Sequence, residues 1–515
     1  MNMTERVTWI RSHVPMGIIA LQAGWLTFYW RTIVDMIRFR STSNRNPATR
    51  SLFGEGVSRD LIIVVDTETV ALNSTASGDL ALLTGLLEQD GVSTLRYADG
   101  GPPSGAPRQD KEFFGSAAIG WIQVTPDEPG DVLRTHGVVW SDGTNLNEGA
   151  LAGDTVPAIA VQLAQRRGHE TSFESTPDAV LVAAADAVGA DILISERRGV
   201  AGLDSQFARG LTVSTVADAI ALIGLFLRSR GNYLEALAKG ITIKASRTAF
   251  FEHSSALFLP HSEEVTDLVR AVSVERNESA IRDLAAASLR RMGRSLQRRD
   301  EVWRLASQVP NADVAEDMSS ALEAMLAALM GAVDATSRLI HVLYGLPGQL
   351  HTSGWQKKQW QKDLRQSTPT IWSAVFEPAS HPASIDVLRL LRNTVHAEGL
   401  SAVDVRTSGR VVATWFLLPL ADGETIVRQA EMVAPLRAWG IFRSSDGSYA
   451  ADPAVLSDRL IPAIFRMLAA VQEVLAGDLR DGIPEVPVRQ SPRLGGPAIA
   501  SSHLKLIGMT PRSTV

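Results

Sequence analysis

The chain has 515 residues, of which 45% are hydrophobic and 21% are charged, and it contains no cysteine. This length exceeds what one hydrophobic core supports, so we expect about three domains or more. The lack of cysteine excludes disulfides, thiolate metal sites and cysteine nucleophiles, and a cytoplasmic location fits best. The formal charge of −6 gives no general attraction to nucleic acid, so RNA or DNA binding requires a local basic surface.

Residues 14–30 form an uncharged, apolar run near the N-terminus. The run contains Pro15, Gly17 and Gln22 and is shorter than the roughly 20 mostly apolar residues of a membrane-spanning helix. No small-residue cleavage site of a signal peptide follows it. Within residues 1–50 we therefore expect an apolar helix docked on the protein or a partner, then a linker. Membrane association through this run is the less favoured alternative.

An α/β domain is expected over residues 51–230, because short apolar runs alternate with helical patterns there. Leu61-Ile-Ile-Val-Val65 is a continuous apolar run, typical of a buried parallel strand. Residues 177–188 begin with Pro and stop before Gly189, which predicts a helix, and an apolar strand follows over residues 191–195. Other expected elements are helices over residues 79–90 and 216–228 and strands over residues 93–97, 117–124 and 131–140. Such alternation predicts a parallel sheet with helices on both faces.

A mainly α-helical region follows, because strand patterns become scarce after about residue 232 and helical periodicity dominates. Helices are expected over residues 262–272, 278–305, 315–346, 385–396 and 453–475. A β-hairpin is expected around Ser408-Gly409. We therefore expect a helical connector over residues 231–311, a helical domain with a hairpin over residues 312–480, and a flexible tail over residues 481–515.

Acidic residues lie where the expected strands end. Asp66 and Glu196 each follow an apolar strand directly, and Asp178 lies in the first turn of the helix before the second strand. Sites in open parallel sheets form where strand carboxyl ends meet helix N-termini. Three carboxylates meeting there repel one another unless a hard cation neutralises them. The sequence thus predicts a Mg²⁺ or Mn²⁺ site that could activate water for attack on a phosphodiester.

At these residues the sequence resembles the PIN-domain nuclease family, over about residues 58–228. The resemblance rests on Val65-Asp66-Thr67, on Asp178 at the start of an Ala-rich helix, and on the strand that ends in Ser195-Glu196. It implies a metal-dependent ribonuclease whose catalytic and metal-binding residues are Asp66, Asp178 and Glu196.

The family's second acidic position has two candidates here, Glu148 and Asp154. The alternative to an active metal site is a degenerate domain with structural carboxylates. In that interpretation Asp178 only satisfies a helix N-terminus, and Asp66 only caps a turn toward Thr69.

A polar cluster ends the apolar helix expected over residues 385–396, in the run Leu390-Leu-Arg-Asn-Thr-Val-His396. Arg392 and His396 are one helical turn apart and can face one groove, with Asn393 adjacent. An imidazole can take the 2′-hydroxyl proton of RNA while a guanidinium holds the scissile phosphate, which gives cleavage without metal.

This cluster resembles the Arg-Asn…His motif of the HEPN superfamily of helical RNases and RNA-binding domains, over about residues 312–480. The resemblance implies catalytic roles for Arg392, Asn393 and His396, and Arg389 is an alternative arginine because its spacing to His396 fits the family better. The helix with Asp334, Arg338 and His341 would be the partner helix. The alternative is a helix end that only caps itself.

Two other features could contact RNA. The helix over residues 281–304 carries many arginines, for which a solvated face is the favoured interpretation. Trp355, Trp360 and Trp372 could stack bases, although tryptophan more often anchors a core or interface. GxxxxGK, HExxH and GxSxG motifs are absent from the sequence, so NTPase, zincin and α/β-hydrolase functions have no support.

The leading hypothesis is an endoribonuclease, a hydrolase in a toxin, stress or phage-defence role, with RNA cleavage by the metal site, by the Arg/His cluster or by both. The alternative is a non-catalytic sensor or scaffold that binds RNA or a protein partner through degenerate nuclease domains. The expected partners are RNA and a second copy of the chain, bound through the helical domain.

Overall fold

The structure is a computed structural model that describes residue 53 and residues 59–72, 78–101, 119–125, 136–141, 146–151, 154–168, 174–203, 211–236, 242–308, 310–397, 399–407, 410–419, 421–444, 447–482 and 497–509. The apolar run over residues 14–30 and the linker after it lie outside these residues. The chain divides into two compact units. The first includes residues 60–70 and 90–214, and the second includes residues 51–59, 71–89 and the chain from Thr215 onward. The domain boundaries expected near residues 230, 311 and 480 stay predictions.

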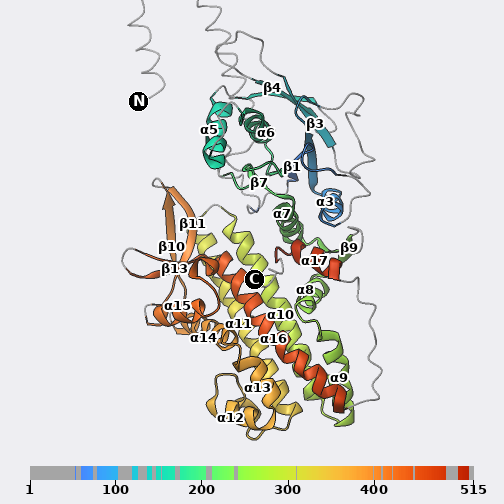
Figure 1. Cartoon of the computed structure of the whole chain (residues 1–515), viewed down its shortest axis with the longest axis vertical. Coiled ribbons are helices and arrows are strands. Elements are labelled where there is room, and N and C mark those ends of the chain that lie inside the picture. The colour runs from blue at the N-terminus through green and yellow to red at the C-terminus, as the bar shows by residue number, and fades with distance from the viewer. Residues whose placement is uncertain are drawn as a thin grey trace, which may run out of the picture. The chain divides into compact units, whose positions relative to one another are not determined.

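The first unit is built on a mostly parallel sheet (Figure 1), in which seven strands are described. The strands are β1 (Leu61–Asp66), β2 (Val92–Tyr97), β3 (Ile119–Thr125), β4 (His136–Ser141), β5 (Leu146–Leu151), β6 (Ile192–Ile194) and β7 (Thr212–Ser214). They lie in the order β5-β4-β3-β2-β1-β6-β7. β3, β2, β1, β6 and β7 are parallel neighbours, whereas β4 and β5 extend the sheet antiparallel. The prediction of an α/β unit with a parallel sheet is confirmed at this level.

Two helices, α5 (Thr155–Arg167) and α6 (Thr176–Ala187), pack beside each other in this unit. Pro177 stands at the start of α6, and Gly189 follows its end with a φ of 72°, a conformation that favours glycine. The buried alanines of α6, with Leu181 and Val182, join strand residues such as Val64 and Leu193 in one core. This packing sets the start of α6 at the edge where β1 and β6 end.

The second unit is mainly helical. Its described helices are α3 (Asp79–Leu87), α7 (Val216–Ser229), α8 (Arg247–Leu257), α9 (Ser262–Glu275), α10 (Ser279–Ala306), α11 (Ala312–Leu343), α12 (Lys358–Ser367), α13 (Pro369–Phe376), α14 (Ser380–Ala397), α15 (Gly423–Glu431), α16 (Pro453–Gly482) and α17 (Pro497–Leu506), with short 3-10 turns η3 (Leu350–Thr352) and η4 (Leu436–Trp439). The long helices α10 and α11 pack along each other, and α14 and α16 lie against α11. Between α10 and α11, the hydroxyls of Ser288 and Thr336 lie 2.9 Å apart. A mainly helical C-terminal region was predicted and is confirmed.

Two small antiparallel sheets complete the described part of the second unit. The expected hairpin is present as β10 (Ser401–Thr407) and β11 (Arg410–Leu417), and β13 (Tyr449–Ala451) and β12 (Ile441–Arg443) extend it in the order β10-β11-β13-β12. A second hairpin, β8 (Tyr233–Ala236) with β9 (Thr242–Ala245), lies in the segment for which the sequence predicted only helices. These strands are four residues long, which is too short for an alternating pattern to stand out.

Helix α17 lies within the tail that composition predicted to be flexible. Leu504, Leu506 and Ile507 are buried, so part of the tail is apolar enough to dock. Arg228 of α7 donates to the Leu506 carbonyl at 2.9 Å, and Arg299 of α10 donates to the carbonyls at the end of α17. These guanidinium groups satisfy carbonyls that have no partner within the helix.

In the described part of the chain, two helices are long and apolar enough to cross a membrane by length and composition. They are α11 and α16, and their most apolar windows are 67% and 56% buried inside the protein. Because core helices pass the same test, this observation is weak evidence for a membrane span.

Candidate functional site

The acidic residues predicted at the strand ends converge on one arginine, Arg197. Asp66 ends β1, Asp178 lies in the first turn of α6, and Arg197 lies shortly after β6. The Asp66 side chain is fully buried, and that of Arg197 is 9% exposed. Arg197 Nε lies 2.9 Å from Asp66 Oδ2, and its Nη2 lies 3.0 Å from Asp66 Oδ1. The two residues thus form a bidentate ion pair.

A third carboxylate, Asp99, joins the same guanidinium from the end of β2. Arg197 Nη1 donates to Asp99 Oδ2 at 3.0 Å and to Asp178 Oδ1 at 2.8 Å, and Nη2 donates to Asp99 Oδ1 at 3.1 Å. A guanidinium has five N–H donors. The contacts to Asp66, Asp99 and Asp178 use each of them once. We call Arg197 and its three aspartates the Arg197 cluster.

A second arginine supports the cluster from α5. Arg167, the last residue of α5, donates to the other oxygen of Asp178 and, through Nε, to the Arg198 carbonyl at 2.8 Å. The Arg167 and Asp178 side chains are 6% and 14% exposed. Three carboxylates against two guanidinium groups leave one net negative charge. The ion pairs therefore almost balance the charge without any added ion.

Hydroxyl groups complete the surroundings of Asp66. Ser195 Oγ and Thr69 Oγ1 donate to Asp66 Oδ2 at 2.8 and 2.7 Å. Burial raises the pKa of Asp66, but the hydrogen bonds from Arg197, Thr69 and Ser195 outweigh burial and hold this pKa below its usual value. Burial likewise lowers the pKa of Arg197, and its aspartates more than compensate, so the pKa is raised. Both groups are therefore charged at neutral pH.

The other predicted acidic residues are Glu196, Glu148 and Asp154. The Glu196 side chain is exposed, and its backbone N–H donates to Thr69 Oγ1 at 3.0 Å. The side chain of Glu148 lies outside the described residues, and its strand β5 is four places from β1, roughly 19 Å at the usual strand spacing. Asp154 is exposed at the start of α5, whose other end carries Arg167, roughly 20 Å away along the helix. The structure brings Asp66 and Asp178 together and supplies Asp99 instead of either candidate.

The donor set around Arg197 does not fit a resident divalent ion. The carboxylate oxygens of the three aspartates all accept hydrogen bonds from Arg197 or Arg167. Mg²⁺ would need such oxygens at about 2.0–2.1 Å, in the space that the guanidinium fills. Within the ranges that the structure describes, no group of three or more acidic or histidine side chains is arranged to hold a metal. The Mg²⁺ or Mn²⁺ site stays a prediction that this arrangement does not support.

Sequence patterns could have revealed both residues that were missed. Asp99 follows β2 as Asp66 ends β1, so the same rule of acidic residues at strand ends applies to it. Arg197 comes after Ser195 and Glu196, the two residues that follow the short strand β6. A basic residue at the sheet edge where acidic strand ends meet can serve as their counter-ion. The pattern of acidic residues alone does not reveal it.

The arginines of the Arg/His element have different surroundings. Arg389 forms an ion pair with Asp386 of the preceding turn, at 3.2 Å. Arg392 is half-buried and Asn393 is exposed. His396 belongs to α14, but its side chain lies outside the described residues.

Arg392 is part of a basic cluster around Asp334, formed by Arg291, Arg338, Lys357 and Arg392. Burial raises the pKa of Asp334, and all four cations lie close enough to oppose that rise. Among the described residues, none of the four forms a hydrogen bond or ion pair with the Asp334 carboxylate. Four cations around one carboxylate leave three net positive charges, and two of the cations, Arg338 and Lys357, are exposed.

Helix packing places these cations. The side chain of Arg291, from α10, lies against α11 at Gly331, which has no side chain. Arg291 Nη1 donates to the Gly331 carbonyl at 2.6 Å. A Cβ at residue 331 would lie 3.0 Å from Arg291 Cδ. Lys357 precedes α12, and this segment is fixed by Trp355, whose Nε1 donates to the Val333 carbonyl at 3.0 Å.

The arginines of α10 divide between core and surface. Arg299 is buried, whereas Arg290, Arg294 and Arg298 are exposed at intervals of about one turn along α10. The predicted solvated face therefore applies to only part of the helix. Trp355 and Trp360 are each 2% exposed, which makes them core residues. Trp372 is partly exposed and stacks on Phe376.

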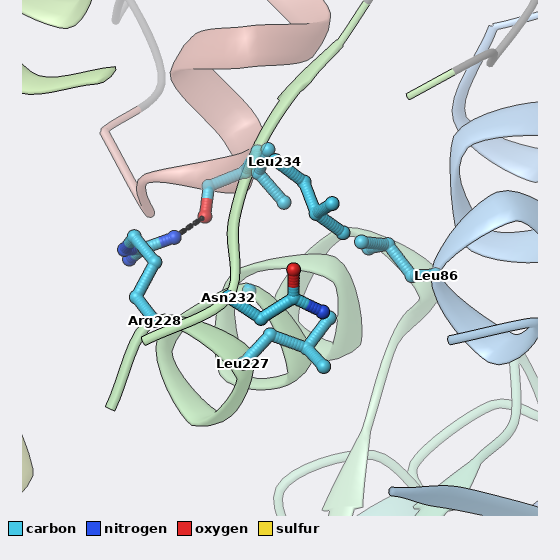
Figure 2. Close-up of a pocket in the computed structure, with 7 residues that line it drawn as sticks. Leu86, Leu227, Arg228, Asn232 and Leu234 are labelled. Carbon is cyan, nitrogen blue, oxygen red and sulfur yellow. Dashed lines mark hydrogen bonds between the residues drawn. The ribbon is translucent and has the colours of Figure 1, made fainter. Parts of the chain in front are cut away.

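A narrow crevice lies beside α7 in the second unit (Figure 2). It is lined by Leu86, Gly224, Leu227, Arg228, Asn232, Leu234 and Leu506. Its one charged group, Arg228, already donates to the Leu506 carbonyl and pairs with Asp300. The crevice is therefore a packing seam below α17 without the convergent polar groups of a ligand site.

Comparison of the chain with models of known protein families, with curated proteins and with solved structures gives no match. The PIN-like and HEPN-like resemblances therefore stay predictions. The geometry of the chain itself carries the functional proposals.

Proposed function

We propose that the helical unit binds the phosphate backbone of RNA through the basic cluster of Arg291, Arg338, Lys357 and Arg392. The observation that carries the proposal is the position of these four cations around one carboxylate, without an ion pair to it among the described residues. Phosphate contacts from Lys and Arg supply most sequence-independent affinity for nucleic acid. The chain as a whole is acidic, so a local surface of this kind is what RNA binding requires.

The exposed arginines of α10 extend the proposed surface. Arg290, Arg294 and Arg298 are four residues apart, so their Cα atoms rise by about 6 Å per step along the helix. They begin beside Arg291, which belongs to the cluster. A flexible polyanion can contact the cluster and this row of arginines at the same time, whereas a small anion contacts only part of them. Single-stranded RNA, which can follow such a row, is the favoured substrate class.

The test is binding of a fluorescent single-stranded RNA by the full chain, measured by anisotropy. The double variant Arg338→Ala/Arg392→Ala should bind about tenfold more weakly or worse, because it removes two phosphate contacts. The matched control is Arg270→Ala/Arg443→Ala, which removes the same charge from exposed positions on α9 and β12. If both double variants weakened RNA binding equally, the loss of positive charge alone would explain the effect. That result would contradict binding at a specific surface.

RNA cleavage without metal at this surface is the second candidate. The observation that favours it is that Arg392 lies in the basic cluster while Arg389 is held by Asp386. His396 is one turn beyond Arg392 on the same helix and would be the proton acceptor by resemblance to HEPN nucleases. His396→Ala should then leave RNA binding unchanged and abolish cleavage that persists in EDTA. A toxin, stress or phage-defence role stays a prediction.

A further inference from the structure

We propose that Arg197 is a built-in cation: its guanidinium occupies the position at the strand ends that the carboxylates alone would offer to a divalent metal ion. The α/β unit then keeps its site intact without metal. This inference concerns the first unit and is independent of RNA binding by the helical unit.

In the Arg197 cluster, every N–H group of the Arg197 guanidinium and every carboxylate oxygen of the three aspartates takes part in a hydrogen bond to arginine or aspartate. Each of the five guanidinium N–H groups of Arg197 donates one hydrogen bond, with nitrogen-to-oxygen distances of 2.8–3.1 Å, and the guanidinium has no further donor. Asp66, Asp99 and Asp178 have both of their oxygens bound to arginine. A planar guanidinium that bridges three carboxylates uses geometry that a lysine or a spherical ion cannot copy.

The contacts also join separate elements of the fold. Asp66 belongs to β1, Asp99 follows β2 and Asp178 belongs to α6, while Arg197 follows β6. A metal ion that entered this space would have to displace Arg197. The displaced guanidinium would lose five hydrogen bonds, and Asp66, with 0% exposure, would lose its bidentate partner. Metal entry is therefore opposed by the native contacts.

Replacing Arg197 by a residue without a charged side chain should open the site to a metal ion. Asp66, Asp99 and Asp178 would then face one another with only the Arg167 charge beside them. Carboxylates held together in this way repel one another and become ligands for a hard cation. Arg197→Ala should therefore acquire a Mn²⁺ site that the natural chain lacks.

The experiment titrates full-length protein with Mn²⁺ and measures free Mn²⁺ by electron paramagnetic resonance, together with the midpoint of thermal unfolding. The variants are Arg197→Ala, Asp178→Asn, and the two combined. Arg198→Ala is the matched control, because Arg198 is the neighbouring, exposed arginine outside the cluster. The probe is Mn²⁺ alone, so the result does not depend on RNA.

The natural chain and Arg198→Ala should bind no Mn²⁺ that depends on Asp178, and neither Mn²⁺ nor EDTA should shift their unfolding midpoint. Arg197→Ala should bind one Mn²⁺ and unfold at a higher temperature in its presence, and the combined variant should lose both effects. One Mn²⁺ bound by the natural chain and lost in Asp178→Asn would overturn the proposal, even if Arg197→Ala does not fold. A folded Arg197→Ala that binds no Mn²⁺ would also overturn it.

Discussion

Because the His503 side chain is buried, we expect docking of α17 to weaken in mild acid. The His503 side chain has no exposure, and its Nε2 lies 2.9 Å from Ser254 Oγ. Ser254 donates its own proton to the Phe250 carbonyl, at 2.7 Å. The network therefore assigns the imidazole proton to Nε2, and Nδ1 is left without a hydrogen-bond partner among the described residues. A proton added at Nδ1 would be buried without an acceptor.

The electrostatics of the site give the size of the effect. Burial first, and then the nearby His253 and Arg228, lower the pKa of His503 from 6.5 to about 3. A base with a lowered folded-state pKa contributes stability above its unfolded pKa and loses it as the pH falls toward the folded pKa. With about 1.4 kcal/mol per pH unit, docking of α17 weakens by about 2 kcal/mol between pH 8 and pH 5. The loss approaches about 3 kcal/mol at pH 4.

Hydrogen exchange of the α17 peptide, read by mass spectrometry from pH 8 to pH 5, measures this change locally. His503→Gln removes the titrating group and keeps an amide that can donate to Ser254. His351→Gln is the matched control, because His351 is an exposed histidine of η3. After correction for intrinsic exchange, the opening free energy of α17 should depend on pH in the natural chain and in His351→Gln. It should depend on pH much less in His503→Gln.

The same pH dependence in His503→Gln and the natural chain would refute this reasoning. It would mean that a group other than His503 takes up the proton, or that the ring is charged in the folded state.

Three further predictions follow from the contacts. Asp66→Asn and Arg197→Met should each lower the free energy of unfolding by about 3–5 kcal/mol, and the combined variant should lose less than their sum in a denaturant double-mutant cycle. Gly224→Ala should raise hydrogen exchange in α17, because the new Cβ would lie 2.5 Å from the Leu506 carbonyl oxygen. Gly440→Ala should lower the unfolding midpoint, because residue 440 has a φ of 65° and the new Cβ would meet a neighbour at 2.8 Å.

The sequence predicted the central strands and long helices because their patterns are strong and local. β1 is a continuous apolar run, α6 has Pro at its start and Gly189 after its end, and α11 keeps helical periodicity over 32 residues. The strand expected over residues 131–140 overlaps β4, which pairs antiparallel with β3. β5 was not predicted, because it is a short edge strand that pairs with β4 and its sequence carries no strong strand pattern.

The composition of the sequence near α17 was misleading for a related reason. The segment from residue 481 is rich in Pro, Gly, Ser and Arg, yet it contains Leu504, Leu506 and Ile507. Docking uses these apolar residues together with Arg228 and Arg299, which are more than 200 residues away in sequence. A local window cannot reveal partners at that separation.

The candidate site was predicted in part. Asp66 and Asp178 meet as the topology of a parallel sheet requires, and the expectation that Asp66 caps a turn toward Thr69 agrees with its hydrogen bond to that hydroxyl. Charge repulsion between the carboxylates demands a cation, and the Arg197 guanidinium supplies it. The sequence could not decide whether the cation is a metal ion or a side chain, because that choice depends on the path of the chain after β6.

The most direct test of the proposed RNA surface is the salt dependence of RNA binding. Each phosphate contact to a single strand adds about 0.7 to the slope of log K against log salt concentration. Between 50 and 200 mM KCl, Arg338→Ala/Arg392→Ala should therefore show a slope smaller by about 1.4 than that of the natural chain. Arg270→Ala/Arg443→Ala should keep the natural slope. An unchanged slope in the first pair, with unchanged affinity, would contradict RNA binding by the basic cluster.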